Sequence, residues 1–215
     1  MQRGWIVWSG LVLALVGRSE QLSMIVLNAE AGQNRIPPGW QIKVNRGTPE
    51  LTLAREGDSS FIHMKSHRSS YGLERGVDVD PVEFPFLTWR WKVTELPVGG
   101  DFRRSRTDDQ AAQVLVAFAD HRVVAYLWDS TAPKGIMQPA SAIPLVHIFA
   151  VVCQSGAAEA NRWIRETRNW REDYERAFAR PAPRVKGIRL QINSQHTGTS
   201  AESYFGEVSF RKSIQ

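Results

Sequence analysis

The most polar stretch of the sequence is the segment 101–109, Asp-Phe-Arg-Arg-Ser-Arg-Thr-Asp-Asp. Its guanidinium groups have the planar fork that suits carboxylates and phosphates, which favours an anionic polysaccharide or lipid head group as ligand. Its paired carboxylates are oxygen ligands of the kind that calcium takes, but they fall short of a full ligand set. The alternative is a solvated loop whose exposed ion pairs contribute little. The candidate ligand-binding residues here are Arg103, Arg104, Arg106, Asp108 and Asp109.

A second group of charges, Glu166, Arg168 and Asp173, lies where a helix is expected to begin. Glycoside hydrolysis needs two carboxyl groups that flank the scissile bond. Glu166 with Asp108 and Asp109 is therefore the candidate acid and base set of a hydrolase or lyase, and Glu166 is also a candidate ligand-binding residue. The alternative is a helix cap with a structural salt bridge. Spacing along the chain does not fix the distance between these carboxyl groups, so we assign no catalytic residue.

The tryptophans offer a different chemistry. Trp89 and Trp91 are two positions apart, so on a strand both indoles share one face while Arg90 and Lys92 share the other. Either the indoles are buried in the core, which is the interpretation we favour, or an indole lines a groove and stacks on a sugar ring. The same alternatives hold for Trp128, and Trp89 and Trp128 are the candidates for ligand stacking.

His196 is the last candidate ligand-binding residue. It lies in the predicted turn 193–198, and loops at the end of a sandwich are common positions for ligand-binding side chains. Turn formation alone is the alternative explanation for this stretch. The sequence holds no Gly-x-Ser-x-Gly elbow, phosphate-binding loop, dinucleotide fingerprint or zinc motif. We therefore expect no metal and no cofactor, with calcium as the one unsupported option.

Most of the chain that must position these residues has a hydrophobic period of two, which predicts strands. Gly, Pro, Asp, Asn and Ser clusters separate the strands, as in an all-β, two-sheet antiparallel β-sandwich of jelly-roll type. The runs 112–119 and 145–153 are apolar on both faces, which predicts central strands covered on each side. The predicted strands are 41–44, 51–55, 61–67, 72–79, 87–93, 112–119, 123–129, 145–154, 186–193 and 202–211.

One short α-helix is expected near 170–179. Asn169 is its cap, with Glu172 three residues on, as in a capping pair. Trp170, Tyr174 and Phe178 then fall on one face, which predicts packing against the sandwich rather than a ligand platform.

The first residues resemble an export signal. Arg3 precedes an uncharged apolar run, 4–17, that is shorter than the ~20 residues that a membrane span needs. We expect residues 1–31 to be a signal peptide, cut near Ala31, with an uncleaved anchor as the alternative. Residues 32–215 are then a single β-sandwich domain in the periplasm or secreted, with no membrane span after cleavage. The single cysteine, Cys153, lies in an apolar run and is expected in the core.

Composition narrows the class of protein. Of 215 residues, 42% are hydrophobic and 23% charged, which excludes a disordered tail and a polytopic membrane protein. The net charge of +5 permits an anionic partner but does not call for nucleic acid. No nucleic-acid partner is expected.

Five segments resemble a bacterial, mostly exported family known as domain of unknown function 3047, over about residues 84–211. The resemblance implies an exported β-sandwich and no particular activity. The closing segment Tyr-Phe-Gly-Glu at 204–207 is also loosely similar to jelly-roll carbohydrate-binding modules. The five segments are 87–93, 108–118, 126–128, 166–169 together with 173–174, and 200–210.

Two functions follow. The one we favour is non-catalytic binding of a glycan or other cell-envelope component, because tryptophan is abundant, at 8 residues, and catalytic motifs are lacking. The alternative is a polysaccharide-acting hydrolase or lyase that uses Asp108, Asp109 and Glu166. A structural role in the envelope is a third option. The geometry of the carboxyl groups separates the first two.

Overall fold

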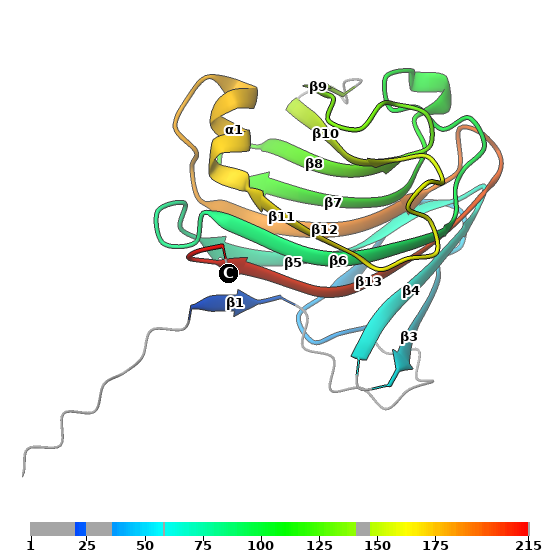
Figure 1. The fold of residues 1–215 in the computed structure, drawn as a ribbon, viewed down its shortest axis with the longest axis horizontal. Helices are drawn as coiled ribbons and strands as arrows, with labels where there is room; N and C mark the ends of the chain where they lie inside the picture. Colours follow the sequence, from blue (N-terminus) through cyan, green and yellow to red (C-terminus); the bar gives the residue numbers. More distant parts are fainter. Residues whose placement is uncertain (1–19, 25–35, 58, 141–146, 215) are drawn as a thin grey trace, which may run out of the picture.

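The computed structural model describes residues 20–24, 36–57, 59–140 and 147–214. Within these ranges the chain forms two β-sheets that pack face to face, with one α-helix beside them (Figure 1). The predicted fold class, an all-β sandwich of jelly-roll type with a short helix, is confirmed. In the same ranges, no helix has the length and apolar character required to cross a membrane.

The first sheet, sheet A, has six strands, and all of its pairs are antiparallel. Its order is β11 (Ile164–Asn169), β6 (Phe86–Glu95), β13 (Ser200–Arg211), β4 (Ser59–His67) and β3 (Glu50–Glu56). The sixth strand, β1 (Gln21–Ser23), pairs with the end of β13. The closing strand β13 is therefore central to the sheet.

The second sheet, sheet B, has seven strands and carries the candidate site. Its order is β2 (Gln41–Arg46), β5 (Ser70–Val79), β12 (Val185–Asn193), β7 (Gln110–Phe118), β8 (Arg122–Asp129), β10 (His147–Ser155) and β9 (Met137–Pro139). The pair of β8 and β10 is parallel, whereas the other pairs are antiparallel. After β8 the described segment 130–140 runs along the free edge of β10, where β9 pairs with it and the backbones of Gly135, Ile136 and Ala140 form further hydrogen bonds to it.

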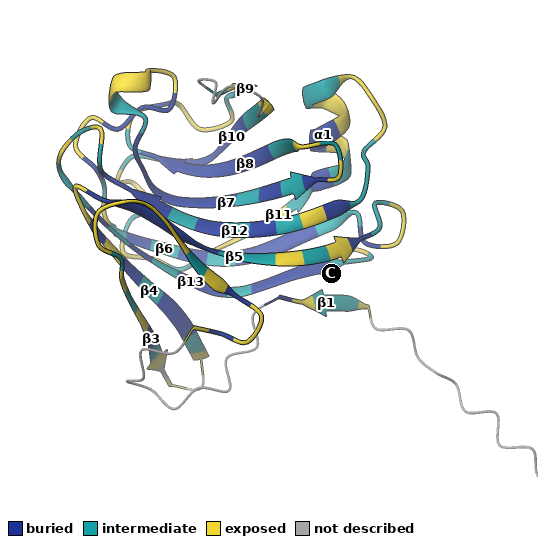
Figure 2. Ribbon diagram, turned by 180° about the vertical axis from the view of Figure 1, so that it is seen from behind, coloured by how far each residue is buried: buried dark blue, intermediate teal, exposed yellow. Residues whose placement is uncertain are grey.

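The core lies between the sheets and follows the strand alternation. Tyr126, Trp89, Trp91 and Trp128 are completely buried there, and in this order successive rings lie with their centroids 5.0, 5.3 and 5.8 Å apart. Figure 2 shows how buried residues run along the strands of both sheets. Cys153 belongs to this core, and burial raises the pKa of its thiol far above the ordinary value.

The single α-helix, α1 (Trp170–Phe178), begins and ends for local reasons. The Asn169 side chain accepts a hydrogen bond from the backbone N–H of Glu172, which confirms the predicted cap. Trp170 and Tyr174 are fully buried and anchor the helix to the sandwich. Ala179 takes a left-handed conformation with φ 52°, which ends the helix.

Part of the predicted leader lies on the sandwich. Most of residues 1–31 fall outside the described residues, but 20–24 are described and contain β1. Met24 is buried, its N–H donates to the Val208 carbonyl at 2.7 Å, and its own carbonyl accepts from Trp40 Nε1 at 3.0 Å and Arg75 at 2.6 Å. The folded unit therefore includes Met24, upstream of the expected boundary at residue 32.

Ten observed strands correspond to the ten predicted ones, and β1, β9 and β11 were not predicted. Strand β11 has the sequence Ile-Arg-Glu-Thr-Arg-Asn and lies at an edge of sheet A, where it pairs only with β6. An edge strand of this kind needs no apolar alternation, so the period of two gives no signal for it.

Candidate functional site

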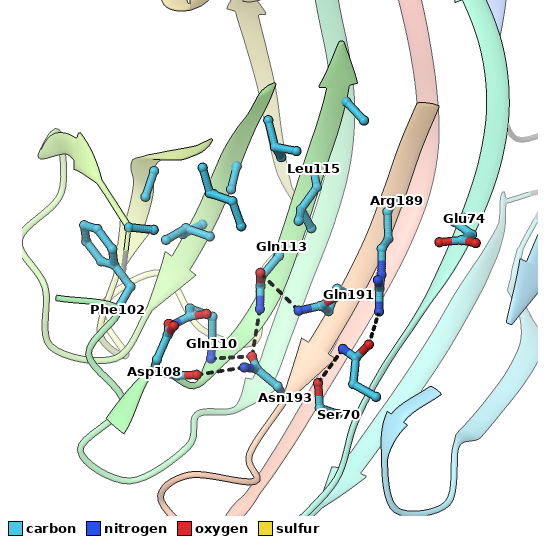
Figure 3. Close-up of a pocket in the computed structure, with 18 of the residues that line it drawn as sticks. Ser70, Glu74, Phe102, Asp108, Gln110, Gln113, Leu115, Arg189, Gln191 and Asn193 are labelled. Atoms are coloured by element: carbon cyan, nitrogen blue, oxygen red, sulfur yellow. Dashed lines mark hydrogen bonds between the residues drawn. The ribbon is translucent and has the colours of Figure 1, made fainter. Parts of the chain in front are cut away.

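A cavity of about 950 Å³ lies on the outer face of sheet B, away from the core (Figure 3). We refer to it as the sheet-B cavity. Its volume lies within the range of about 300–1,000 Å³ that is usual for small-molecule sites. Strands β2, β5, β12, β7, β8 and β10 all contribute to its lining.

The strand register arranges the floor of the cavity in three rows that run across the sheet. Each row begins at β5 and ends at β10, and its members are direct neighbours on adjacent strands. The first row is Gly76, Gly187, Ala117, Val123 and Ile148; the second is Glu74, Arg189, Leu115, Ala125 and Ala150; the third is Gly72, Gln191, Gln113, Leu127 and Val152.

Small side chains explain why the sheet is hollow at this place. A Cβ atom at Gly76 would meet nothing within 4 Å, and one at Gly187 would make only ordinary contacts at 3.7 Å. Ala117 is the next residue in the same row. Because side chains on neighbouring strands normally fill the space above a sheet face, this run of small residues leaves depth for a ligand.

The polar half of the cavity, along β12 and β7, is a network of amides. Asn193 Oδ1 accepts from Gln113 Nε2 at 2.7 Å and from the Gln110 N–H at 2.8 Å. Asn193 Nδ2 donates to the Asp108 carbonyl at 2.8 Å, and Gln191 Nε2 donates to Gln113 Oε1 at 3.5 Å. Figure 3 shows these side chains in sequence along the two strands. The mutual bonds hold the amide groups in fixed orientations.

Arg189 is a cation on the cavity floor, and Arg75 of β5 is a second lining arginine, whose guanidinium donates to the Met24 carbonyl. The Arg189 guanidinium donates to Asn45 Oδ1 at 3.2 Å and lies over Gly72, where a Cβ atom would approach the Arg189 Nε to 2.7 Å. No carboxylate lies within 4.0 Å of it among the residues that the structure describes. Burial lowers the pKa of Arg189, and the charge of Glu74 only partly offsets this effect.

The apolar half of the cavity, along β8 and β10, is bordered by side chains of the segment 130–140 that follows β8. Phe102, Ala132, Ile136 and Ala140 pack there against the outer face of β8 and β10 in a second apolar cluster, separate from the core. Buried Asp129 holds the adjacent loops in place. Its carboxylate accepts from the backbone N–H groups of Phe102, Thr131 and Ala132 at 3.0, 2.9 and 2.7 Å.

The loop 101–109 forms one rim of the cavity, but its arginines do not line it. Phe102, Ser105 and Asp108 are the lining residues from this loop. Arg103 forms a two-pronged ion pair with buried Asp101 at 2.7 and 2.8 Å, which lowers the pKa of that carboxyl, and Arg104 lies 3.9 Å from it. Arg103, Arg104 and Arg106 are all solvent-exposed. The predicted arginine-lined groove therefore depends on Arg189 rather than on these three residues.

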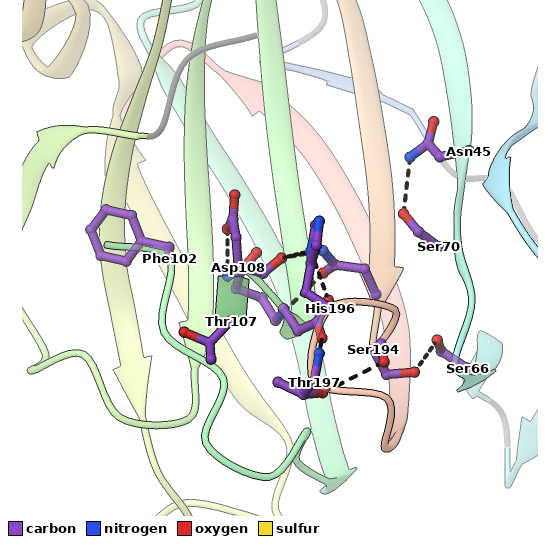
Figure 4. A network of polar contacts seen from close by, with 12 residues as sticks. Asn45, Ser66, Ser70, Phe102, Thr107, Asp108, Ser194, His196 and Thr197 are labelled. Atoms are coloured by element: carbon purple, nitrogen blue, oxygen red, sulfur yellow. Dashed lines mark hydrogen bonds and ion pairs between the residues drawn. The ribbon is translucent and has the colours of Figure 1, made fainter. Parts of the chain in front are cut away.

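Three predicted residues, Asp108, Asp109 and His196, do come together at one end of the cavity (Figure 4). His196 Nδ1 lies 3.0 Å from the Asp108 carbonyl and 3.4 Å from Asp109 Oδ1. Asp109 is fully buried and accepts from the Thr197 N–H at 2.6 Å, whereas Asp108 and His196 line the cavity. Asp109 therefore fastens the turn that presents His196.

Glu166 lies elsewhere, at the edge where the two sheets meet. It accepts a hydrogen bond from Gln154 Nε2 of β10 at 2.6 Å, and burial raises its pKa. Arg168 pairs with Asp173 at 2.6 and 2.9 Å instead, as in the structural salt bridge considered above. The contacts of Glu166 thus share no residue with those of Asp108 and Asp109, and the three carboxyl groups do not form one site.

Trp89 and Trp128 are not available for stacking on a ligand. Both are 0% exposed, because their positions on β6 and β8 face the space between the sheets. Both tryptophans therefore belong to the hydrophobic core, which is the interpretation favoured from the sequence. Phe102 is the one aromatic residue among those that line the cavity, and only 1% of it is exposed.

An aromatic cluster lies instead on the outer face of sheet A, where Trp163 and Tyr204 are half-buried and Phe61 is buried. The three rings surround Lys92, whose Nζ lies 5.2, 4.4 and 6.0 Å from the centroids of Trp163, Tyr204 and Phe61. Arg90 lies 5.1 Å from the Trp163 ring. These ring faces contact the protein's own cations, so the cluster is a cation–π arrangement within the chain.

The described residues contain no group of three or more histidine, cysteine, aspartate or glutamate side chains that could hold a metal ion.

Sequence reasoning missed the amides and Arg189. A signal for them exists in the predicted strand 186–193, where Arg189, Gln191 and Asn193 alternate with Ile188, Leu190 and Ile192. This alternation predicts that the outer face of the strand is polar. Only the strand register shows that Gln113 of β7 lies next to Gln191 and extends the polar surface across the sheet.

The fold and the cavity define a jelly-roll-type β-sandwich with a binding-sized cavity on the outer face of a sheet. The chain belongs to the family described as "Protein of unknown function (DUF3047)", whose model matches residues 38–209. The match begins before the expected residue 84 and so includes β2 to β5. The comparison with curated proteins gives no match.

Solved structures share the fold at low sequence identity. The xyloglucanase domain of NopAA, a type three effector from Sinorhizobium fredii, is 7% identical with a TM-score of 0.50, over 83% of this chain and 95% of that domain. The family 11 carbohydrate-binding module of a Clostridium thermocellum cellulase is 6% identical with a TM-score of 0.45, over 91% and 96%. The family 11 xylanase of Neocallimastix patriciarum is 9% identical with a TM-score of 0.40, over 91% and 98%.

Proposed function

We propose that this protein is an exported, non-catalytic binding protein whose sheet-B cavity holds a glycan or another cell-envelope ligand. The observation that carries the proposal is the fixed row of amides beside Arg189. Gln113 and Asn193 are about 95% buried and bonded to each other, so they are pre-oriented for a ligand. Amides offer both donors and acceptors, and the guanidinium adds donors, which is the combination that sugar hydroxyl groups require.

The placement of carboxylates in the cavity supports binding rather than hydrolysis. Glu74 on β5 and Asp108 before β7 are the carboxylates that line it, and β12 lies between those strands. Two strand spacings of about 4.8 Å separate their backbones by about 10 Å across the sheet. Asp108 is also displaced along the strands, because the register places Glu74 level with Leu115 and not with the start of β7. The two carboxylates are therefore further apart than the carboxyl pairs of glycosidases, which lie about 5–9.5 Å apart.

Export is the second part of the proposal, and the N-terminal apolar run 4–17 supports it. Because Met24 contributes to the core, we place processing before Glu20 rather than near Ala31. Amino-terminal sequencing of protein recovered from the periplasmic and culture fractions of an expressing bacterium tests this. Recovery of all of the protein with an intact Met1 in the cytosol contradicts the export proposal.

A glycan array followed by polysaccharide retention assays tests the binding function. The array includes cellobiose, because the similar xyloglucanase domain was solved with that sugar. We expect retention of at least one glycan at millimolar concentration, and we expect Gln191→Ala to weaken it about five- to tenfold through the loss of one hydrogen-bonding group. Arg104→Ala is the matched control, because Arg104 is exposed and does not line the cavity. If no glycan is retained at millimolar concentration, the proposal is wrong.

A further inference from the structure

The outer face of β7 has apolar residues that the rest of the described chain leaves partly uncovered. The run 112–119 was expected to be covered on both sides, but Leu115 and Ala117 line the cavity and are only half-buried. Val123 on β8 and Ile148 on β10 continue this apolar surface and are also half-buried. The four side chains form a continuous wall, because they are neighbours in the first two rows of the register.

The polar and apolar surfaces belong to one cavity and meet at a sharp boundary. In the second row Arg189 on β12 is followed directly by Leu115 on β7 and then by Ala125 on β8. In the third row Gln113 is followed directly by Leu127. One ligand that occupies the cavity therefore meets amides and a cation at one end and aliphatic side chains at the other.

A sugar alone does not match the apolar end. Sugars usually meet apolar surface by stacking on an exposed aromatic ring. Among the described lining residues, Phe102 alone is a phenylalanine, tyrosine or tryptophan, and it is buried. Aliphatic side chains such as Leu115 and Ile148 gain instead from contact with flexible hydrocarbon, which removes apolar surface from water.

We propose that the ligand is an amphiphile, with a sugar or similar hydroxylated head group on the polar half and an alkyl or acyl chain on the apolar half. This inference rests on the proposed function, which it narrows to acylated or alkylated glycans. The segment that carries Ala132, Ile136 and Ala140 borders the cavity at the end that would hold the alkyl chain. The amides of β12 and β7 fix the position of the head group.

A homologous series of alkyl glucosides, from methyl to octyl, separates the two halves. The purified full chain is titrated with each compound below its micelle-forming concentration, with cellobiose and the matching alkyl alcohols as further probes. Each added methylene that enters the apolar half is expected to tighten binding about fourfold. The alcohols, which lack the sugar, are expected to bind more weakly than the glucosides of equal chain length.

Paired variants assign the two effects to the two halves. Leu115→Gln is expected to flatten the dependence on chain length, whereas Gln191→Ala weakens every glucoside by a common factor and leaves that dependence unchanged. Leu51→Gln is the matched control, because Leu51 is a half-buried leucine on a strand of sheet A. Circular dichroism confirms that each variant is folded.

The outcomes distinguish this inference from the proposed function. Equal affinity for methyl and octyl glucoside overturns the amphiphile while the glycan proposal stands. Alcohols that bind as tightly as glucosides overturn both, because the amides then contribute nothing. Affinity that rises with chain length equally in Leu115→Gln and Leu51→Gln also overturns the inference, because the chain then lies outside the cavity.

Discussion

Two loops beside the cavity, the one before β7 and the one after β8, are held by one buried carboxylate, Asp129. We expect its removal to lower the stability of the protein. Asp129 accepts three backbone hydrogen bonds, from Phe102, Thr131 and Ala132. In Asp129→Ala these N–H groups lose their acceptor. Thr131 is exposed, so water can replace its bond, but Phe102 and Ala132 are buried.

The structure sets the size of the effect. Each buried N–H left without a partner costs about 1–3 kcal/mol, so the two buried donors, Phe102 and Ala132, together cost about 2–6 kcal/mol. Burial raises the pKa of Asp129, which means that its charge is itself costly to bury, and removal of this cost returns part of the loss. We expect a net decrease in the free energy of unfolding of about 2–4 kcal/mol.

Asp129→Asn gives a graded test, because an asparagine retains one carbonyl oxygen. That oxygen can still serve Thr131 and Ala132, while the amide NH₂ faces the Phe102 N–H, so we expect about half of the alanine effect. Urea unfolding measures both free energies, and amide hydrogen exchange at Phe102 and Ala132 shows whether the loops have loosened. Asp80→Ala is the control, because Asp80 also accepts two backbone bonds but in an exposed turn. A loss below about 1 kcal/mol in Asp129→Ala, or equal losses at Asp129 and Asp80, refutes the reasoning.

Three further predictions concern the N-terminus, an ion cluster and the cavity floor. A chain that starts at residue 32 lacks β1 and the buried Met24, so its free energy of unfolding in urea should be about 2–5 kcal/mol lower than that of a chain that starts at residue 20. Equal free energies contradict the inference that β1 and Met24 belong to the folded unit. The ion cluster is Glu202 of β13 with Thr94, His63 and Lys65: burial raises the pKa of Glu202, but hydrogen bonds from these three side chains outweigh burial and lower the pKa from 4.5 to about 2. The wild type should therefore be more stable than Glu202→Gln above pH 4.5 and lose this advantage as the pH falls through about 2. A difference in urea midpoints that does not change with pH is the opposing result. In Gly72→Ala the new Cβ atom would lie 2.5 Å from the Leu190 backbone carbonyl and 2.7 Å from Arg189 Nε, so strands β5 and β12 would have to shift apart. We expect this variant to have a lower urea midpoint than the wild type, and an unchanged midpoint contradicts the close approach at Gly72.

The fold was predictable because most strands show either apolar–polar alternation or, as in β7 and β10, a short apolar run between turn residues. Trp89 and Trp91 on one face of a strand, with Arg90 and Lys92 on the other, required a sandwich with one buried side. Strand β11 was not predictable in the same way, because an edge strand with one apolar residue resembles a loop in sequence.

The site was less predictable, because it depends on register between distant segments. Arg189, Leu115 and Ala125 are separated by many residues in sequence, and only the pairing of β12, β7 and β8 makes them neighbours. The loop 101–109 attracted attention through its charge density, yet its arginines balance Asp101 beside the cavity. The high charge of this loop therefore reflects its exposure to solvent, whereas the pairing of β12, β7 and β8 determines which side chains line the cavity.

The measurement that tests the central claim most directly is a nuclear magnetic resonance titration with octyl glucoside that maps where the ligand binds. We predict saturable shifts of the side-chain amide signals of Gln113 and Gln191 and of the methyl signals of Leu115, with the indole signal of Trp163 on sheet A unchanged. Saturable shifts confined to Trp163 and its neighbours, with the amide and Leu115 signals unmoved, would contradict the assignment of the sheet-B cavity as the binding site.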